Sequence, residues 1–275
     1  MSPAMRLLAA VSVAALWVQS APAAVVALVV GADYRAADES RLALVNTLID
    51  AAAVTTLLRK IGAADVQLIE NPSGDDWQAA VARFVQTLRP DDIAVLYYAG
   101  HAVQVNGENY FVTADGEALV SAEEILSAVM QRARGTIFAI DACRNNPFRK
   151  ATAFERIVKV RDVGPTDARS YQTFEMSDLV SVTGLSQMNN VRGRNAVVLF
   201  STEPGNVAVD GAPGDGSPFA HAVVRELGRR QSFDAAVRRI TDAVSQATRG
   251  TQSPWRQGDL GFPLFLAGQP RFPVP

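Results

Sequence analysis

The chain of 275 residues contains one cysteine, Cys143, and two histidines, His101 and His221. A thiol becomes an effective nucleophile when it is exposed and a nearby imidazole can take up and return its proton. Such a pair can carry out acyl transfer if N–H donors stabilise the oxyanion that forms. The sequence therefore raises the question of which histidine meets Cys143, with a small buried structural cysteine as the alternative.

Two of these three residues follow predicted strands closely. Residues 93–98 (IAVLYY) form an apolar run with His101 just beyond it, and residues 136–140 (TIFAI) form another with Cys143 just beyond it. In an open α/β sheet the active crevice lies beyond the carboxyl ends of the parallel strands. We therefore expect His101 and Cys143 to face each other there. We interpret His221, which lies inside a predicted helix, as a surface or core residue.

The rest of the chain must supply the elements that hold these two residues. Short continuous apolar runs predict strands buried on both faces, and amphipathic periods predict helices. Their alternation predicts an α/β fold, a three-layer αβα sandwich around a mostly parallel sheet. The other predicted strands are residues 25–31, 66–69, 196–200 and 262–266. A hairpin is predicted over residues 103–111, with its turn at Asn106-Gly107. The predicted helices are residues 42–61, 75–89, 121–132, 217–230 and 233–248.

A single catalytic domain over residues 24–270 accounts for this pattern. Its large segment covers about 24–148 and its small segment about 195–270. Between them, residues 149–194 are polar and show no sustained period. A stretch of that length without clear structure indicates functional loops or disorder.

The first residues have the pattern of a signal peptide. Arg6 precedes an apolar run over residues 7–18, and Ala21-Pro22-Ala23 resembles a cleavage site. Because the run is short for a ~30 Å hydrocarbon core, we predict a signal peptide over residues 1–23 and a protein that is exported to the periplasm or secreted, with no membrane association after cleavage. The formal net charge of −2 and the absence of a basic stripe give no reason to expect nucleic acid.

The segments around the two strand ends resemble the histidine and cysteine motifs of bacterial caspase-like peptidases, relatives of the metacaspases. A third similar run lies downstream, and the resemblance covers nearly the whole chain after the signal peptide. The matching segments are Tyr97-Tyr98-Ala99-Gly100-His101-Ala102, Asp141-Ala142-Cys143-Arg144-Asn145-Asn146-Pro147-Phe148, and Ser201 to Ala208 followed by Asp210-Gly211 and Ser217-Pro218-Phe219.

The resemblance implies a caspase-hemoglobinase fold with a six-stranded sheet and a cysteine-type endopeptidase activity. Cys143 would attack the scissile carbonyl and His101 would protonate the leaving amine. The backbone N–H groups of Cys143 and Ala102 would bind the oxyanion. Relatives usually carry glycine at the position of Ala102. If that position needs a positive φ, alanine would be strained by about 1 kcal/mol or more, and the alternative is a catalytically impaired homologue that binds peptides or proteins.

The residues near Cys143 also predict specificity. Side chains two apart on a strand point to the same face, so Asp141 should lie beside Cys143. A carboxylate at the pocket mouth would select a positive side chain through charge-assisted hydrogen bonds. By resemblance to metacaspases, Asp50 on the first helix would join it, and Ser201 is a further candidate substrate-binding residue. We therefore predict cleavage after Arg or Lys, although Asp141 as a hydrogen-bonded strand end and Asp50 as a surface residue are the alternatives.

The expected partner is a peptide or protein substrate, with no cofactor and no metal site. Metacaspases can depend on calcium, but no coordination loop is readable in this sequence. A doubly wound binding module with a structural cysteine is a third alternative. No phosphate-binding loop follows the first strand, which argues against it. The sequence leaves open whether the protein is a monomer or a dimer.

Overall fold

The structure is a computed structural model. It describes residues 23–37, 42–142, 156–158, 171–172, 182–189, 191 and 195–268. The predicted signal segment, apart from Ala23, lies outside this range, and so does Cys143. Within the described residues, no helix has the length and apolar character needed to cross a membrane.

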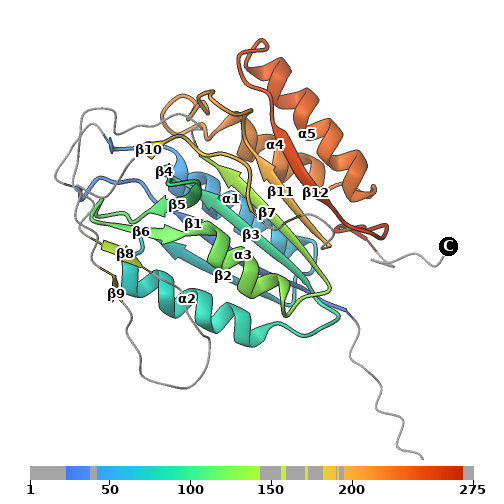
Figure 1. Cartoon of the computed structure of the whole chain (residues 1–275). Coiled ribbons are helices and arrows are strands. Elements are labelled where there is room, and N and C mark those ends of the chain that lie inside the picture. The colour runs from blue at the N-terminus through green and yellow to red at the C-terminus, as the bar shows by residue number, and fades with distance from the viewer. Residues whose placement is uncertain are drawn as a thin grey trace, which may run out of the picture.

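A mostly parallel sheet forms the centre of the molecule (Figure 1). Within the described residues it has six strands in the order β12-β11-β7-β3-β1-β2. Only β12 is antiparallel to its neighbour. The four central strands are buried along their whole length, which explains their unbroken apolar sequences. The strands are β1 (Val25–Gly31), β2 (Asp65–Glu70), β3 (Ile93–Ala99), β7 (Gly135–Asp141), β11 (Ala196–Phe200) and β12 (Trp255–Asp259).

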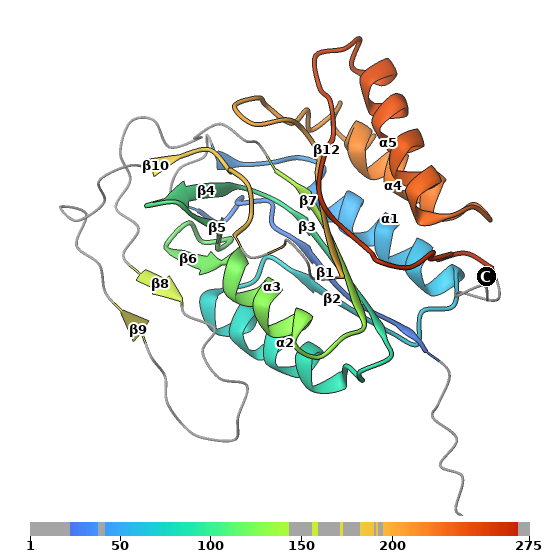
Figure 2. The same ribbon diagram turned by 45° about the vertical axis from the view of Figure 1, so that its right-hand side comes forward.

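Helices cover both faces of this sheet, as the alternating sequence pattern predicts (Figures 1 and 2). One face packs against α1 (Thr47–Lys60), α4 (Pro218–Leu227) and α5 (Phe233–Ala247). The other face packs against α2 (Gly74–Thr87) and α3 (Ala122–Met130). The result is the predicted three-layer αβα sandwich. Side chains that alternate along each strand supply its two cores.

A second, smaller sheet lies beside the carboxyl end of β3. The predicted hairpin is confirmed as β4 (Ala102–Val105) and β5 (Glu108–Val112), which pair across Asn106 and Gly107. Both turn residues have positive φ, 51° and 87°, as this type of tight turn requires. A strand that the sequence did not predict, β6 (Ala118–Ser121), extends the hairpin. The polar segment 149–194 adds β8 (Arg156–Val158), β9 (Tyr171–Gln172) and β10 (Val182–Thr183) to this sheet.

The predicted last strand at residues 262–266 is wrong. Pro263 has no N–H for a ladder, and Leu264 and Leu266 are instead buried against the helices of one face. The sheet ends at β12, whose sequence WRQGD gives no apolar signal because an edge strand need not be buried on both sides.

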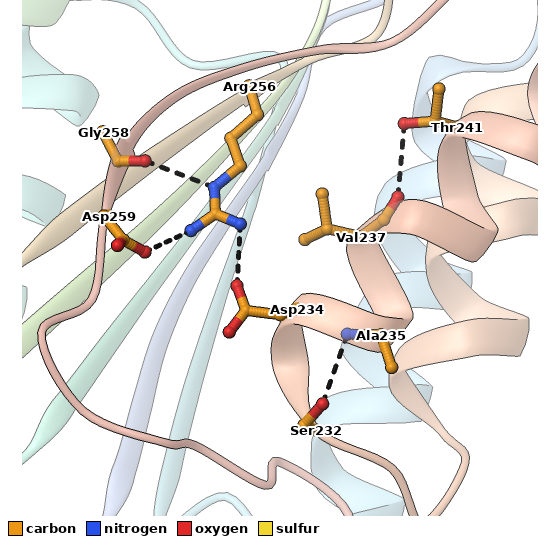
Figure 3. Close-up of polar contacts among 8 residues, drawn as sticks. All are labelled: Ser232, Asp234, Ala235, Val237, Thr241, Arg256, Gly258 and Asp259. Carbon is orange, nitrogen blue, oxygen red and sulfur yellow. Dashed lines mark hydrogen bonds and ion pairs between the residues drawn. The ribbon is translucent and has the colours of Figure 1, made fainter.

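Arg256 fixes this edge strand to the helix layer (Figure 3). Its Nη1 donates to Asp234 Oδ1 over 2.7 Å, at the first turn of α5. The guanidinium also binds the Asp259 carboxylate and the Gly258 carbonyl oxygen. A charged, internally paired side chain is one way in which proteins protect an edge strand from pairing with other chains.

Candidate active site

His101 lies just beyond the carboxyl end of β3, separated from it by Gly100. The chain must turn there beside two tyrosine hydroxyls. A Cβ on Gly100 would come within 2.6 Å of Tyr98 Oη and 2.9 Å of Tyr34 Oη, so no larger residue fits without displacing them. The sequence pattern of a small residue before the histidine therefore has a steric cause.

The imidazole of His101 is held by a backbone carbonyl. Its Nε2 lies 2.8 Å from the carbonyl oxygen of Leu42. Because a carbonyl can only accept, the proton of the neutral ring resides on Nε2, and Nδ1 is the nitrogen that can take up a proton. Burial lowers the pKa of His101 below its ordinary value of 6.5, while the Leu42 carbonyl and Asp210 act in the opposite direction. The neutral ring is thus the favoured form near pH 7.

Cys143 falls outside the described residues, but the chain is described up to Ala142. β7 pairs in parallel with β3 so that Asp141 stands opposite Ala99, and Gly100 N–H donates to Asp141 O over 3.2 Å. Ala142 and His101 line the same pocket. The two strand ends therefore adjoin, as the sequence predicts, and Ala142, the last described residue before Cys143, lies at this pocket.

The hollow at these strand ends measures about 340 Å³ when the open solvent at its mouth is included. Its walls come from the start of α1, the ends of β3 and β7, and the loop between β11 and α4. No lysine or arginine is among the described residues that line it. The lining residues are Leu44, Thr47, Asp50, Ala99, Gly100, His101, Asp141, Ala142, Ala208, Val209, Asp210 and Ser217.

Two of the predicted specificity residues, Asp141 and Asp50, meet in this pocket. Both carboxylates are buried, and Ser217 bridges them. Its Oγ donates to Asp141 Oδ2 over 2.5 Å, and its N–H donates to Asp50 Oδ1 over 3.0 Å. The structure thus places Asp50 on the buried side of α1 and excludes the alternative of an ordinary surface residue.

Burial and a neighbouring like charge raise the pKa of both carboxyls. Burial, followed by the charge of Asp50, raises the pKa of Asp141 from 3.8 to about 7. Burial raises the pKa of Asp50 to about 6, with a smaller contribution from Asp210 and an opposing one from Ser217. No lysine or arginine is among the described residues around these two carboxyls in the pocket, and a bound cation would favour their charged forms.

Asp210 is a third acidic residue of the pocket and was not among the predicted site residues. Its Oδ2 accepts from Val45 N–H over 2.9 Å. Asp210-Gly211 belongs to one of the segments that carry the family resemblance. That segment could have indicated Asp210 as a site residue.

Asn46 holds the loop of Asp210 against helix α1. Its buried amide donates to the carbonyl oxygens of Asp210 and Ala212 over 2.7 and 2.8 Å, and it accepts from Gly214 N–H over 2.8 Å. This contact explains why α1 begins at Thr47 and not at residue 42 as predicted. The segment before the helix binds the loop instead of adding a helical turn.

Ala102 is buried at the start of β4, and it is not among the described residues with positive φ. The strain considered for alanine at this position therefore does not arise. Val112 N–H donates to His101 O, so the next pair, Ala102 and Phe111, is of the non-hydrogen-bonded kind. The N–H of Ala102 consequently points away from β5.

Two further residues, Ser201 and His221, are not among the described residues that line the pocket. Ser201 is fully buried behind Asp141, where its hydroxyl donates to Ala142 O over 3.4 Å and also lowers the pKa of Asp141. His221 is exposed on α4, as expected of a helix-surface residue. Within the part of the chain that the structure describes, no group of three or more His, Cys, Asp or Glu side chains could hold a metal ion.

Comparisons with known proteins agree with this architecture. The profile of the caspase domain matches residues 24–265. Caspase-1 from Spodoptera frugiperda is similar in structure, with a TM-score of 0.61 at 14% sequence identity over 90% of this chain and 93% of that one. A structural-genomics protein from Geobacter sulfurreducens gives 0.61 at 15% identity, over 90% and 98%. No curated protein matches the sequence. The predicted fold is thereby confirmed.

Proposed function

Because this chain belongs to the caspase-domain family, we propose that it is a cysteine endopeptidase that cleaves peptide bonds after arginine or lysine. Family membership supports cysteine peptidase chemistry in general. The preference for a basic residue is inferred from one observation: Asp50, Asp141 and Asp210 line a single pocket beside His101.

In the proposed mechanism, His101 Nδ1 accepts the thiol proton of Cys143, and the thiolate attacks the scissile carbonyl carbon. The backbone N–H groups of Cys143 and Ala102 donate to the oxyanion that forms. His101 then gives its proton to the leaving amine as the C–N bond breaks. Water attacks the resulting thioester, with His101 as base, and releases the acid and the free thiol.

The pocket carboxylates would select the residue on the amino side of the scissile bond. Electrostatic attraction in a buried site is stronger than in water, and a guanidinium offers several donors to carboxylate oxygens. A substrate cation would also lower the pKa of Asp141 and Asp50, because it favours their charged forms. An acidic substrate residue would instead meet like charge.

Strain at Ala102 was the reason to expect a catalytically impaired homologue. Since φ of Ala102 is not positive, that reason falls away, and the active enzyme is the function that we favour.

Fluorogenic peptides that differ only in one residue test the proposal. Arginine, lysine, aspartate and citrulline substrates should be compared on the purified protein, with and without calcium, and with Cys143→Ala as control. Citrulline has nearly the shape of arginine but no charge, so a large preference for arginine would report the carboxylates directly. Absence of turnover above the Cys143→Ala background would reject the peptidase, and equal turnover of arginine and citrulline would reject the proposed pocket.

A further inference from the structure

Two tyrosine side chains surround the backbone of His101. Tyr34 comes from the loop after β1, and Tyr98 from β3 itself. His101 N–H donates to Tyr34 Oη over 2.8 Å, and Tyr98 Oη donates to His101 O over 2.5 Å. The two hydroxyl oxygens are 2.9 Å apart, so Tyr34 Oη can donate to Tyr98 Oη. The amide and the carbonyl of one residue are thus joined through two phenols.

Tyr34 also contacts the imidazole. Its ring centroid lies 4.5 Å from that of His101, with a tilt of 41° between the planes. Its hydroxyl accepts from His101 N–H, and its one proton can go either to Tyr98 Oη or to Val112 O, 3.0 Å away. The Tyr34 side chain therefore fixes His101 at two places, the backbone amide and the ring.

The position of the two phenols is itself well determined. Tyr34 and Tyr98 are fully buried, and the Tyr98 ring stacks on Phe111 with centroids 4.0 Å apart. Tyr34 has a φ of 57°, which costs an L-residue energy and persists only when the surroundings enforce it. Gly100 leaves the space that both hydroxyls occupy.

We propose that Tyr34, assisted by Tyr98, is a positioning residue for His101, which it holds in the orientation needed for proton exchange with Cys143. This inference rests on the proposed peptidase function. Tyr34 does not line the pocket and is given no proton-transfer role. Its effect would act through the orientation of the imidazole, and small misplacements of a catalytic group can reduce rates about a hundredfold.

Tyr34→Phe tests this role because it keeps the ring and removes only the hydroxyl. We expect kcat for an arginine substrate to fall about tenfold to a hundredfold, with KM nearly unchanged because the pocket carboxylates are untouched. Tyr98→Phe should act in the same direction and decides the question if Tyr34→Phe fails to fold. Tyr110→Phe is the matched control, since its hydroxyl bonds Glu108 and not His101, and it should keep wild-type kcat.

A second readout needs no substrate. The chain has only two histidines, so His221→Gln leaves the ring signals of His101 alone in an NMR titration. In wild type the ring should titrate below 6.5, because burial lowers its pKa. In Tyr34→Phe the looser, better hydrated ring should titrate closer to 6.5. A purely structural tyrosine would change the melting temperature without moving this titration.

The outcomes separate the two proposals. If Tyr34→Phe and Tyr98→Phe fold and keep both kcat and the His101 titration, the positioning role is refuted while the peptidase stands. If the wild type cleaves no peptide, the peptidase is refuted. The titration then still decides whether Tyr34 controls the imidazole.

Discussion

Replacement of Asp141 by asparagine should make the protein more stable at pH 8 and remove its preference for arginine. Asparagine keeps an oxygen that can accept from Ser217 Oγ, but it carries no charge beside Asp50. The variant therefore removes the electrostatic cost of the pocket and keeps most of its packing. Active sites commonly hold such unfavourable groups at the expense of stability.

The magnitude follows from the pKa shift. A rise from 3.8 to about 7 corresponds to about 4 kcal/mol, at 1.36 kcal/mol for each pH unit. Because Asp50 shares the repulsion, we expect a gain of about 2–4 kcal/mol in the free energy of unfolding. Below pH 4 the carboxyl is protonated in the folded and the unfolded chain, and wild type has no penalty. As the pH rises to 7 and above, the folded protein must also release this proton, which it binds more tightly than the unfolded chain does. The free energy of unfolding of the wild type therefore falls over this range.

Urea unfolding at pH 4 and pH 8 measures this difference. The midpoint of Asp141→Asn should exceed that of wild type at pH 8 and approach it at pH 4. Asp242→Asn, an exposed site on α5, is the control and should change neither midpoint by much. In parallel, the ratio of kcat/KM for arginine and citrulline peptides should fall toward one. A variant that is less stable than wild type at pH 8 would refute the reasoning, since the carboxylate would then stabilise the fold through its hydrogen bonds.

Three further predictions concern the same site. In wild type, the arginine-to-citrulline ratio of kcat/KM should rise between about pH 5 and pH 8, because Asp50 and Asp141 ionise with pKa values of about 6 and 7; a flat ratio would contradict it. Asn46→Ala removes the hydrogen bonds that hold residues 210–214. It should raise KM for arginine peptides about tenfold, with an unchanged His101 titration, as kinetics and NMR would show. Gly100→Ala places a Cβ 2.6 Å from Tyr98 Oη, so it should lower the melting temperature and kcat together, whereas wild-type values for both would exclude the steric argument.

The local sequence pattern was enough to predict the layers of the fold and the edge of the sheet at which the candidate site lies. Continuous apolar runs such as 93–98 and 136–140 can be buried on both faces only inside a covered parallel sheet, so the strands, the flanking helices and the crevice followed from local pattern. The same logic predicted that the ends of β3 and β7 adjoin, and His101, Asp141 and Ala142 line one pocket there. The edge strand β12 was not predicted, because an edge strand does not need a continuous apolar sequence.

Which polar residues from distant segments share the pocket could be seen only once the chain was folded. Asp210 and Asn46 are 164 residues apart in sequence yet in hydrogen-bond contact, and no local period encodes such a meeting. The contacts of the two tyrosines with His101 could likewise not be predicted, since the sequence does not distinguish them from tyrosines that only pack in the core. Spacing along one strand predicts which face of the sheet a side chain lies on. Contacts between loops depend instead on how distant segments pack against each other in the folded chain.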